Sequence, residues 1–258
     1  MKGISMKETN YTIKEDFELP SKGLIYSKKV NPHVELRSMT TRDEMKRTNP
    51  TSTPMKNQAE MIENCMIEKP AIHVWDMALG DYEYLLHKLR IVTYGPEYKM
   101  VVGCPHCDKV FEMKANLDEL KVQEFDLDAF KALQTVELPV SGKTVTLRFQ
   151  TPRMIDEINN KSKAMKAEHP NSGLNYRDLV TLMCVIETVD TGRLTPVELE
   201  DFCMNLSARD SNTILNRLPK MNMMLGLDTK ITTTCDSCGG DIITYFRVGP
   251  EFFRPSED

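Results

Sequence analysis

The sequence lacks any apolar stretch close to the roughly 18 residues that a membrane-spanning helix needs. Its first residues, MKGISMKETNYT, are polar and have none of the apolar core of a signal peptide. These absences argue against helical membrane spans and against secretion. We therefore expect a protein that is made and used in a cytoplasm.

A surplus of basic charge is also missing. Lys and Arg number 33 against 38 Asp and Glu, which gives a formal net charge of −5 over 258 residues. A protein that coats nucleic acid needs a basic face to neutralise phosphate groups. The composition argues against such a role.

Catalytic and nucleotide-binding motifs are absent as well. Neither GxGxxG nor GxxxxGK(S/T) occurs, and neither does HExxH or GxSxG. Acidic pairs such as Asp43/Glu44 lie at expected helix starts, where the helix dipole accounts for them. The five histidines are scattered and have no neighbouring nucleophile: His33, His73, His87, His106 and His169. We expect no enzyme and no small-molecule substrate.

What the sequence does contain is two CxxC pairs. Seven cysteines, an odd number, without a secretion signal favour free thiols or metal ligands over a disulfide framework. CPHC at 104–107 and CDSC at 235–238 each lie between β-prone segments. This pattern is typical of zinc knuckles, in which a strand enters a tight turn and a second strand leaves it. Gly239 and Gly240 give the second turn backbone freedom.

Four thiolates complete the tetrahedral coordination of Zn²⁺ and leave no open position for a catalytic water. We therefore expect one structural zinc ion per chain, bound by Cys104, Cys107, Cys235 and Cys238. A redox dithiol is an alternative, but such motifs usually place the attacking cysteine at a helix N-terminus. His106 is left out, because the middle of such a turn usually points away from the metal. The remaining cysteines lie among apolar helical residues and are interpreted as buried thiols: Cys65, Cys184 and Cys203.

Short motifs recur in the same order in the two halves of the chain. FELPSKG from Phe17 matches VELPVSG from Val136, and VELRSMTTRDEM matches TVTLRFQTPRMIDEI downstream. CMIE then matches CVIE, and DYEYLLHKL from Asp81 matches DSNTILNRL from Asp210. Last, GPEYKMVVGCPHC matches GLDTKITTTCDSC. Collinear matches of this kind predict an internal duplication in which each half delivers one CxxC pair.

The predicted fold class is α+β, with two pseudo-repeat halves joined at a zinc-ribbon-like site of four cysteines. Each half is expected to hold a β-hairpin, then helices, then the strand that enters its knuckle. The expected segments are a flexible arm over 1–14, a first repeat over 15–115, a bridging segment over 116–134, a second repeat over 135–250 and a tail over 251–258. Helices are expected over 56–68, 73–92, 153–167, 175–188 and 196–218, with a helix start at 40–44.

The layout resembles a known family. An N-terminal hairpin motif LPSKG, the segment VELRSMTTRDE, a midchain CPHC and a late CDSC are similar to the baseplate hub assembly proteins of T-even-like contractile-tailed phages. The resemblance covers most of the chain in layout but only short motifs in identity. It is strongest over residues 17–45 and 92–113.

The resemblance implies a non-enzymatic virion or virion-assembly protein, either a baseplate hub protein or a hub assembly chaperone. It implies other baseplate and tail proteins as partners, and a place of action in the infected bacterial cytoplasm. The family's cysteine pattern carries over to Cys104 and Cys107, whereas Cys235 and Cys238 depend on spacing and on the duplication.

A second interpretation stays open, because zinc knuckles often bind nucleic acid. It is a zinc-ribbon protein that binds nucleic acid or serves transcription. Basic residues do lie near the knuckles, but acidic residues among them would oppose a phosphate. The basic residues are Lys99, Lys109, Lys114, Lys230 and Arg247.

Overall fold

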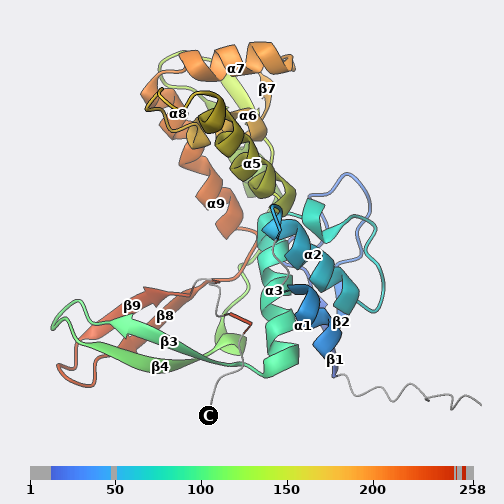
Figure 1. Ribbon diagram of the computed structural model, residues 1–258, viewed down its shortest axis with the longest axis vertical. Coiled ribbons are helices and arrows are strands. Elements are labelled where there is room, and N and C mark those ends of the chain that lie inside the picture. Colours follow the sequence, from blue (N-terminus) through green and yellow to red (C-terminus); the bar gives the residue numbers. More distant parts are fainter. Residues whose placement is uncertain (1–12, 48–50, 247, 249–251, 254–258) are drawn as a thin grey trace, which may run out of the picture.

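Two helical lobes and a projecting arm of two β-hairpins form the protein (Figure 1). The structure, a computed structural model, describes residues 13–47, 51–246, 248 and 252–253. The arm expected over 1–14 lies outside the described residues except for Ile13 and Lys14. Helices and small antiparallel sheets make up the described chain, which confirms the predicted α+β class. No helix in these ranges is both long and apolar enough to span a bilayer.

The N-terminal lobe, residues 13–94, is built around helix α3. Its elements are β1 (Lys14–Glu18), β2 (His33–Arg37), α1 (Thr41–Arg47), α2 (Pro54–Cys65), the 3-10 turn η1 (Val74–Asp76) and α3 (Leu79–Tyr94). The strands β1 and β2 pair antiparallel, with Phe17 opposite Val34. The apolar stripe of α3 at three- and four-residue spacing, including Leu85 and Leu89, is buried in the lobe core.

The C-terminal lobe, residues 125–225, has its own core. Its elements are α4 (Leu127–Gln134), β5 (Thr135–Glu137), β6 (Thr144–Leu147), α5 (Pro152–Glu168), α6 (Arg177–Val185), β7 (Ile186–Val189), α7 (Pro196–Asn205), α8 (Ala208–Leu215) and α9 (Arg217–Met223). Phe125 and Phe130 join this core, so the segment expected to bridge the halves contributes to packing. Helix α4 begins where the Asp126 carboxylate accepts from the N–H groups of Asp128 and Ala129.

Two helix predictions in this lobe are wrong in extent. The helix expected over 175–188 ends at Val185, because the β-branched residues that follow form β7. Strand β7 pairs with β6 and extends the expected hairpin to a three-stranded sheet. The helix expected over 196–218 is divided into α7, α8 and α9. Helix α8 begins where Ser207 accepts from the N–H of Asp210, and α9 begins after Asn216.

A buried aspartate ties a helix to a hairpin turn in each lobe. Asp81 on α3 accepts from the backbone N–H of Ser21 at 2.9 Å. Asp210 on α8 accepts from the backbone N–H of Val140 at 2.8 Å. Both aspartates are 1% exposed or less. Each carboxylate therefore orders the turn of the hairpin that precedes it in the chain.

The lobes contact each other where α5 begins. The Asp156 carboxylate accepts from the N–H groups of Met55 and Lys56 in the first turn of α2, at 3.2 and 2.9 Å. It also accepts from Trp75 Nε1 at 3.1 Å. A carboxylate at a helix N-terminus satisfies free N–H groups and the helix dipole together. This residue of one lobe therefore caps a helix of the other.

Gly80 on α3 lies directly against the end of α9. A Cβ atom at this position would lie 2.2 Å from the carbonyl oxygen of Leu225. We expect Gly80→Ala to lower the free energy of unfolding by about 1–3 kcal/mol, because the clash is with backbone and outweighs the better helix propensity of alanine. Urea unfolding measures the change. Gly192→Ala, whose nearest neighbour would be 3.9 Å away, is the matched control, and equal stability of the two variants would contradict this packing.

Candidate metal centre

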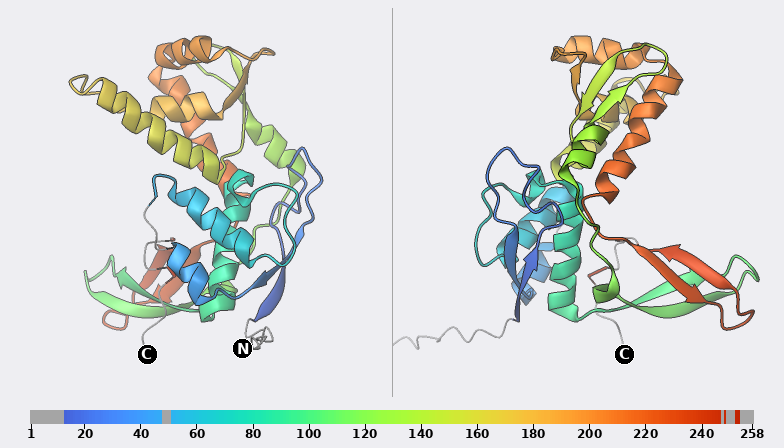
Figure 2. Two further views of the ribbon diagram at one scale, coloured as in Figure 1. Left: turned by 45° about the vertical axis from the view of Figure 1, so that its right-hand side comes forward. Right: turned by 180° about the vertical axis from the view of Figure 1, so that it is seen from behind.

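The arm consists of two antiparallel hairpins that face each other (Figure 2). Its strands are β3 (Glu97–Gly103) with β4 (Val110–Asn116), and β8 (Lys230–Thr234) with β9 (Asp241–Tyr245). Val102 from the first hairpin and Ile242 from the second are 4% and 2% exposed and share a small core with Cys104 and Cys235. Segments separated by more than a hundred residues thus meet at one site.

The turns at the tips of the two hairpins share one backbone pattern. In the first turn, Cys104 N–H donates to Lys109 O at 2.8 Å and Asp108 N–H donates to Cys104 O at 3.0 Å. In the second, Cys235 N–H donates to Gly240 O at 2.9 Å and Gly239 N–H donates to Cys235 O at 2.8 Å.

The residue after each second cysteine is left-handed. Asp108 has φ of 57° and Gly239 has φ of 69°. Glycine adopts this conformation without a steric penalty, and aspartate is one of the few side chains that tolerate it. The two knuckle turns are therefore alike in backbone form although their sequences share little beyond the cysteines.

The four predicted cysteines come together between the two turns. Cys104 Sγ lies 3.7 Å from Cys238 Sγ, and Cys107 Sγ lies 3.7 Å from Cys235 Sγ. All four sulfurs lie within 4.8 Å of one another. A tetrahedral site with Zn–S bonds of about 2.3 Å separates its sulfurs by about 3.8 Å, whereas a disulfide needs about 2.05 Å. The spacing fits four ligands around a metal.

One cysteine of the second turn, Cys235, is favoured as a thiolate. Its pKa is lowered to about 6, first because the backbone N–H of Cys238 donates to its sulfur and next because that of Ser237 does, whereas the pKa values of Cys107 and Cys238 lie above the ordinary thiol value. Metal-binding cysteines must be deprotonated. Across the hairpins, Lys109 Nζ donates to Ser237 Oγ at 2.7 Å. This donor set suits a soft, tetrahedral metal site, in which an ion bound by all four sulfurs would have no open coordination position.

His106 lies next to the four sulfurs but is not one of the side chains that could share an ion with them. Its backbone N–H donates to Cys104 Sγ at 3.4 Å, and its Nε2 lies 3.0 Å from the carbonyl oxygen of Asp241 in the other hairpin. A Cβ at Gly240 would lie 2.5 Å from the His106 ring. The imidazole thus bridges the two hairpins, a contact between segments distant in sequence that the sequence analysis did not predict.

The three other cysteines lie in the lobes and outside the cluster. Cys65 and Cys203 are buried, and burial raises the pKa of each thiol to about 12. Cys184 is likewise buried, and burial raises the pKa of its thiol. Within the described part of the chain, the only group of three or more cysteine, histidine or acidic side chains close enough to share an ion is the four-cysteine cluster.

The sequence analysis also missed how the arm is fixed to the N-terminal lobe. Arg90 on α3 is fully buried. Its Nη2 donates to Glu97 O at 2.9 Å, its Nε donates to Phe252 O at 3.2 Å, and its Nη1 donates to Gly95 O. The guanidinium of Arg90 therefore connects helix α3 to the start of β3 and to Phe252 near the C-terminus. Phe252, from the expected tail over 251–258, is fully buried in the N-terminal core.

A comparison with known protein families gives one match. A family described as T4 bacteriophage base plate protein matches residues 10–254 of the 258. No curated protein and no solved structure matches the chain significantly. The match runs through both lobes and both hairpins of the arm.

Proposed function

This chain belongs to the T4 bacteriophage base plate protein family, and from that membership we propose that it is a hub protein or hub assembly factor of a contractile-tail baseplate. It acts through contacts with other tail proteins and not through catalysis. The family match over residues 10–254 is the observation that carries the proposal. The arm and the two lobes supply separate surfaces that neighbouring subunits of an assembly could contact (Figure 1).

The buried ionisable groups support a structural role. Asp81, Asp156 and Asp210 are at most 1% exposed, and each accepts from backbone N–H groups. Arg90 donates to backbone carbonyls. These charges are used to hold turns, a helix start and the arm in place, as buried charges in a rigid protein are expected to be.

The arm is proposed to bind one structural Zn²⁺ through Cys104, Cys107, Cys235 and Cys238. Support comes from the sulfur spacing of 3.7 Å in the two cross-hairpin pairs and from the all-thiolate donor set, which excludes hard cations such as Mg²⁺. The small shared core of the arm is too limited to hold two hairpins together alone. A metal cross-link would supply the missing stability.

The two halves are further proposed to descend from one duplicated unit, with repeats over 15–115 and 135–250. The paired contacts of Asp81 and Asp210 with aligned hairpin turns support this, and so do the identical hydrogen-bond patterns of the two knuckles. Superposing the two repeats in an experimental structure tests the idea. Hairpins and knuckles that fail to superpose together would contradict it.

Deleting the gene in a phage that encodes this chain tests the proposed function. We expect tails without functional baseplates, and we expect mass spectrometry to find the chain in the purified particle, in assembly intermediates made in the host cytoplasm, or in both. Normal particles assembled without the gene would refute the proposal. Tight, steeply salt-dependent retention on heparin would instead favour the nucleic-acid interpretation.

A further inference from the structure

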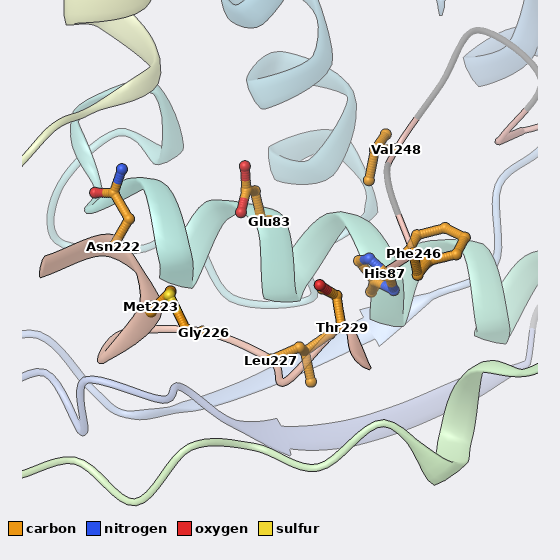
Figure 3. Close-up of a pocket in the computed structure, with 9 residues that line it drawn as sticks. All are labelled: Glu83, His87, Asn222, Met223, Gly226, Leu227, Thr229, Phe246 and Val248. Atoms are coloured by element: carbon orange, nitrogen blue, oxygen red, sulfur yellow. The ribbon is translucent and has the colours of Figure 1, made fainter. Parts of the chain in front are cut away.

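A cavity of about 360 Å³ lies at the base of the arm, where α3 meets the end of α9 and the segments that flank β8 and β9 (Figure 3). Glu83 and His87 line it from α3, one helical turn apart. Asn222 lines it from α9, and Thr229 and Phe246 line it from the arm side. The volume falls in the range of binding pockets that take a side chain or a small ligand.

The cavity contains hydrogen-bond acceptors, but few donors among the described lining residues face them. Glu83 is exposed to solvent at this open cavity and has no hydrogen-bond or ion-pair partner among the described residues, and desolvation by the surrounding protein raises the pKa of its carboxyl to about 7. Asn222 Nδ2 donates to Gln150 Oε1 at 2.8 Å, which turns its Oδ1 away from that contact and leaves it free to accept. Among the lining residues that the structure describes, there is no lysine or arginine. An unmatched carboxylate in a partly enclosed site is complementary to a cation.

His87 adds an independent sign that a partner group is missing. It is 3% exposed, and its Nδ1 is a buried polar atom without a hydrogen-bond partner in the described structure. Burial lowers the pKa of His87 to about 3, so the ring is neutral and does not compete with a cation for Glu83. A buried unsatisfied nitrogen is uncommon in a folded protein and points to a group that arrives on binding.

We propose that this cavity receives a lysine side chain from a neighbouring baseplate protein, with its ammonium group paired to Glu83. The acceptors lie on different elements, which suits the three divergent donors of an ammonium better than the planar fork of a guanidinium. The exposed thioether of Met223 and the ring of Phe246 provide apolar walls for the methylene stem. The identity of the donor as a baseplate protein rests on the proposed function.

The first test uses n-butylammonium, the side-chain analogue of lysine, and the isolated chain. Titration at about pH 8, above the raised pKa of Glu83, is followed through the His87 ring resonances. We expect half-saturation at roughly 1–10 mM, as befits a single side chain, and at least tenfold weaker binding to Glu83→Gln. Glu200→Gln, an exposed glutamate on α7, is the matched control. Equal binding of butylammonium and the neutral 1-pentanol, or no loss in Glu83→Gln, would overturn the assignment.

The second test uses assembled material. Zero-length carbodiimide cross-linking of purified baseplates or assembly intermediates, followed by mass spectrometry, should join Glu83 to a lysine of another tail protein. The Glu83→Gln chain should lose this product. If the chain is present in the assembly but Glu83 forms no such link, the cavity assignment fails and the proposed function stands. If the chain is absent from every assembly, the proposed function fails and the butylammonium titration still decides the cavity.

Discussion

Cys235→Ser is expected to abolish zinc binding and to loosen both hairpins of the arm, including the one that carries no substitution. Wild-type protein should contain one zinc per chain by elemental analysis, and the variant none. The reason is the shared site, because each hairpin supplies only two of the four sulfurs and the two pairs are interleaved. Structural zinc sites have apparent binding free energies of about 10–16 kcal/mol at neutral pH, so the loss of one ligand removes a large contribution.

Amide hydrogen exchange resolves where the stability is lost. We expect exchange at least about tenfold faster in β3–β4 as well as in β8–β9, equivalent to about 1.4 kcal/mol or more of local stability. Cys203→Ala, which removes a buried thiol of the C-terminal lobe, should keep its zinc and its protected arm. Faster exchange confined to β8–β9, or a metal-free wild-type arm that stays folded in chelator, would contradict a shared structural site.

Arg90→Met should destabilise the N-terminal lobe and release the base of the arm. The guanidinium is fully buried and donates to the carbonyl oxygens of Gly95, Glu97 and Phe252. It also lies 5.3 Å from the centroid of the Tyr98 ring. Methionine fills similar space but cannot donate a hydrogen bond to these carbonyls, and each lost hydrogen bond from a charged group costs roughly 1–3 kcal/mol before relaxation.

We expect a net loss of about 3 kcal/mol in the free energy of unfolding of Arg90→Met, measured by urea denaturation. Arg90→Lys should lose somewhat less, because one ammonium reaches fewer of the three carbonyls. Arg209→Met, at an exposed position on α8, should change stability by no more than about 0.5 kcal/mol. A similarly small effect at Arg90 would show that these hydrogen bonds do not anchor the arm.

Several elements could be predicted because their causes are local. Helix α5 begins at Pro152, where Thr151 accepts from the N–H of Met154, and helix α7 begins with a capping box at Thr195 and Glu198. These signals are contained within four residues of sequence. The apolar residues of α3 recur at three- and four-residue spacing, so the sequence alone predicts which face of this helix is buried.

The predictions that were wrong depend on distant partners. Whether Ile186–Val189 continue a helix or form a strand is decided by the pairing with β6, because an apolar β-branched segment suits either state locally. A contact that no prediction addressed also joins distant residues, because Arg90 Nε donates to the carbonyl oxygen of Phe252, whose ring is buried in the N-terminal core. Residue composition near the C-terminus gives no sign of that contact.

The candidate site divides in the same way. The sequence by itself determined the chemistry, because two CxxC pairs define four thiolates of the right number and type for zinc, and short collinear motifs indicated a phage baseplate family. Only the tertiary structure decided that the sulfurs meet in cross-hairpin pairs at 3.7 Å, that Arg90 holds the arm on α3, and that Glu83 and His87 line one cavity. The physical reason is that ligand type is a property of single residues, whereas distance and burial arise only when packing brings remote segments together.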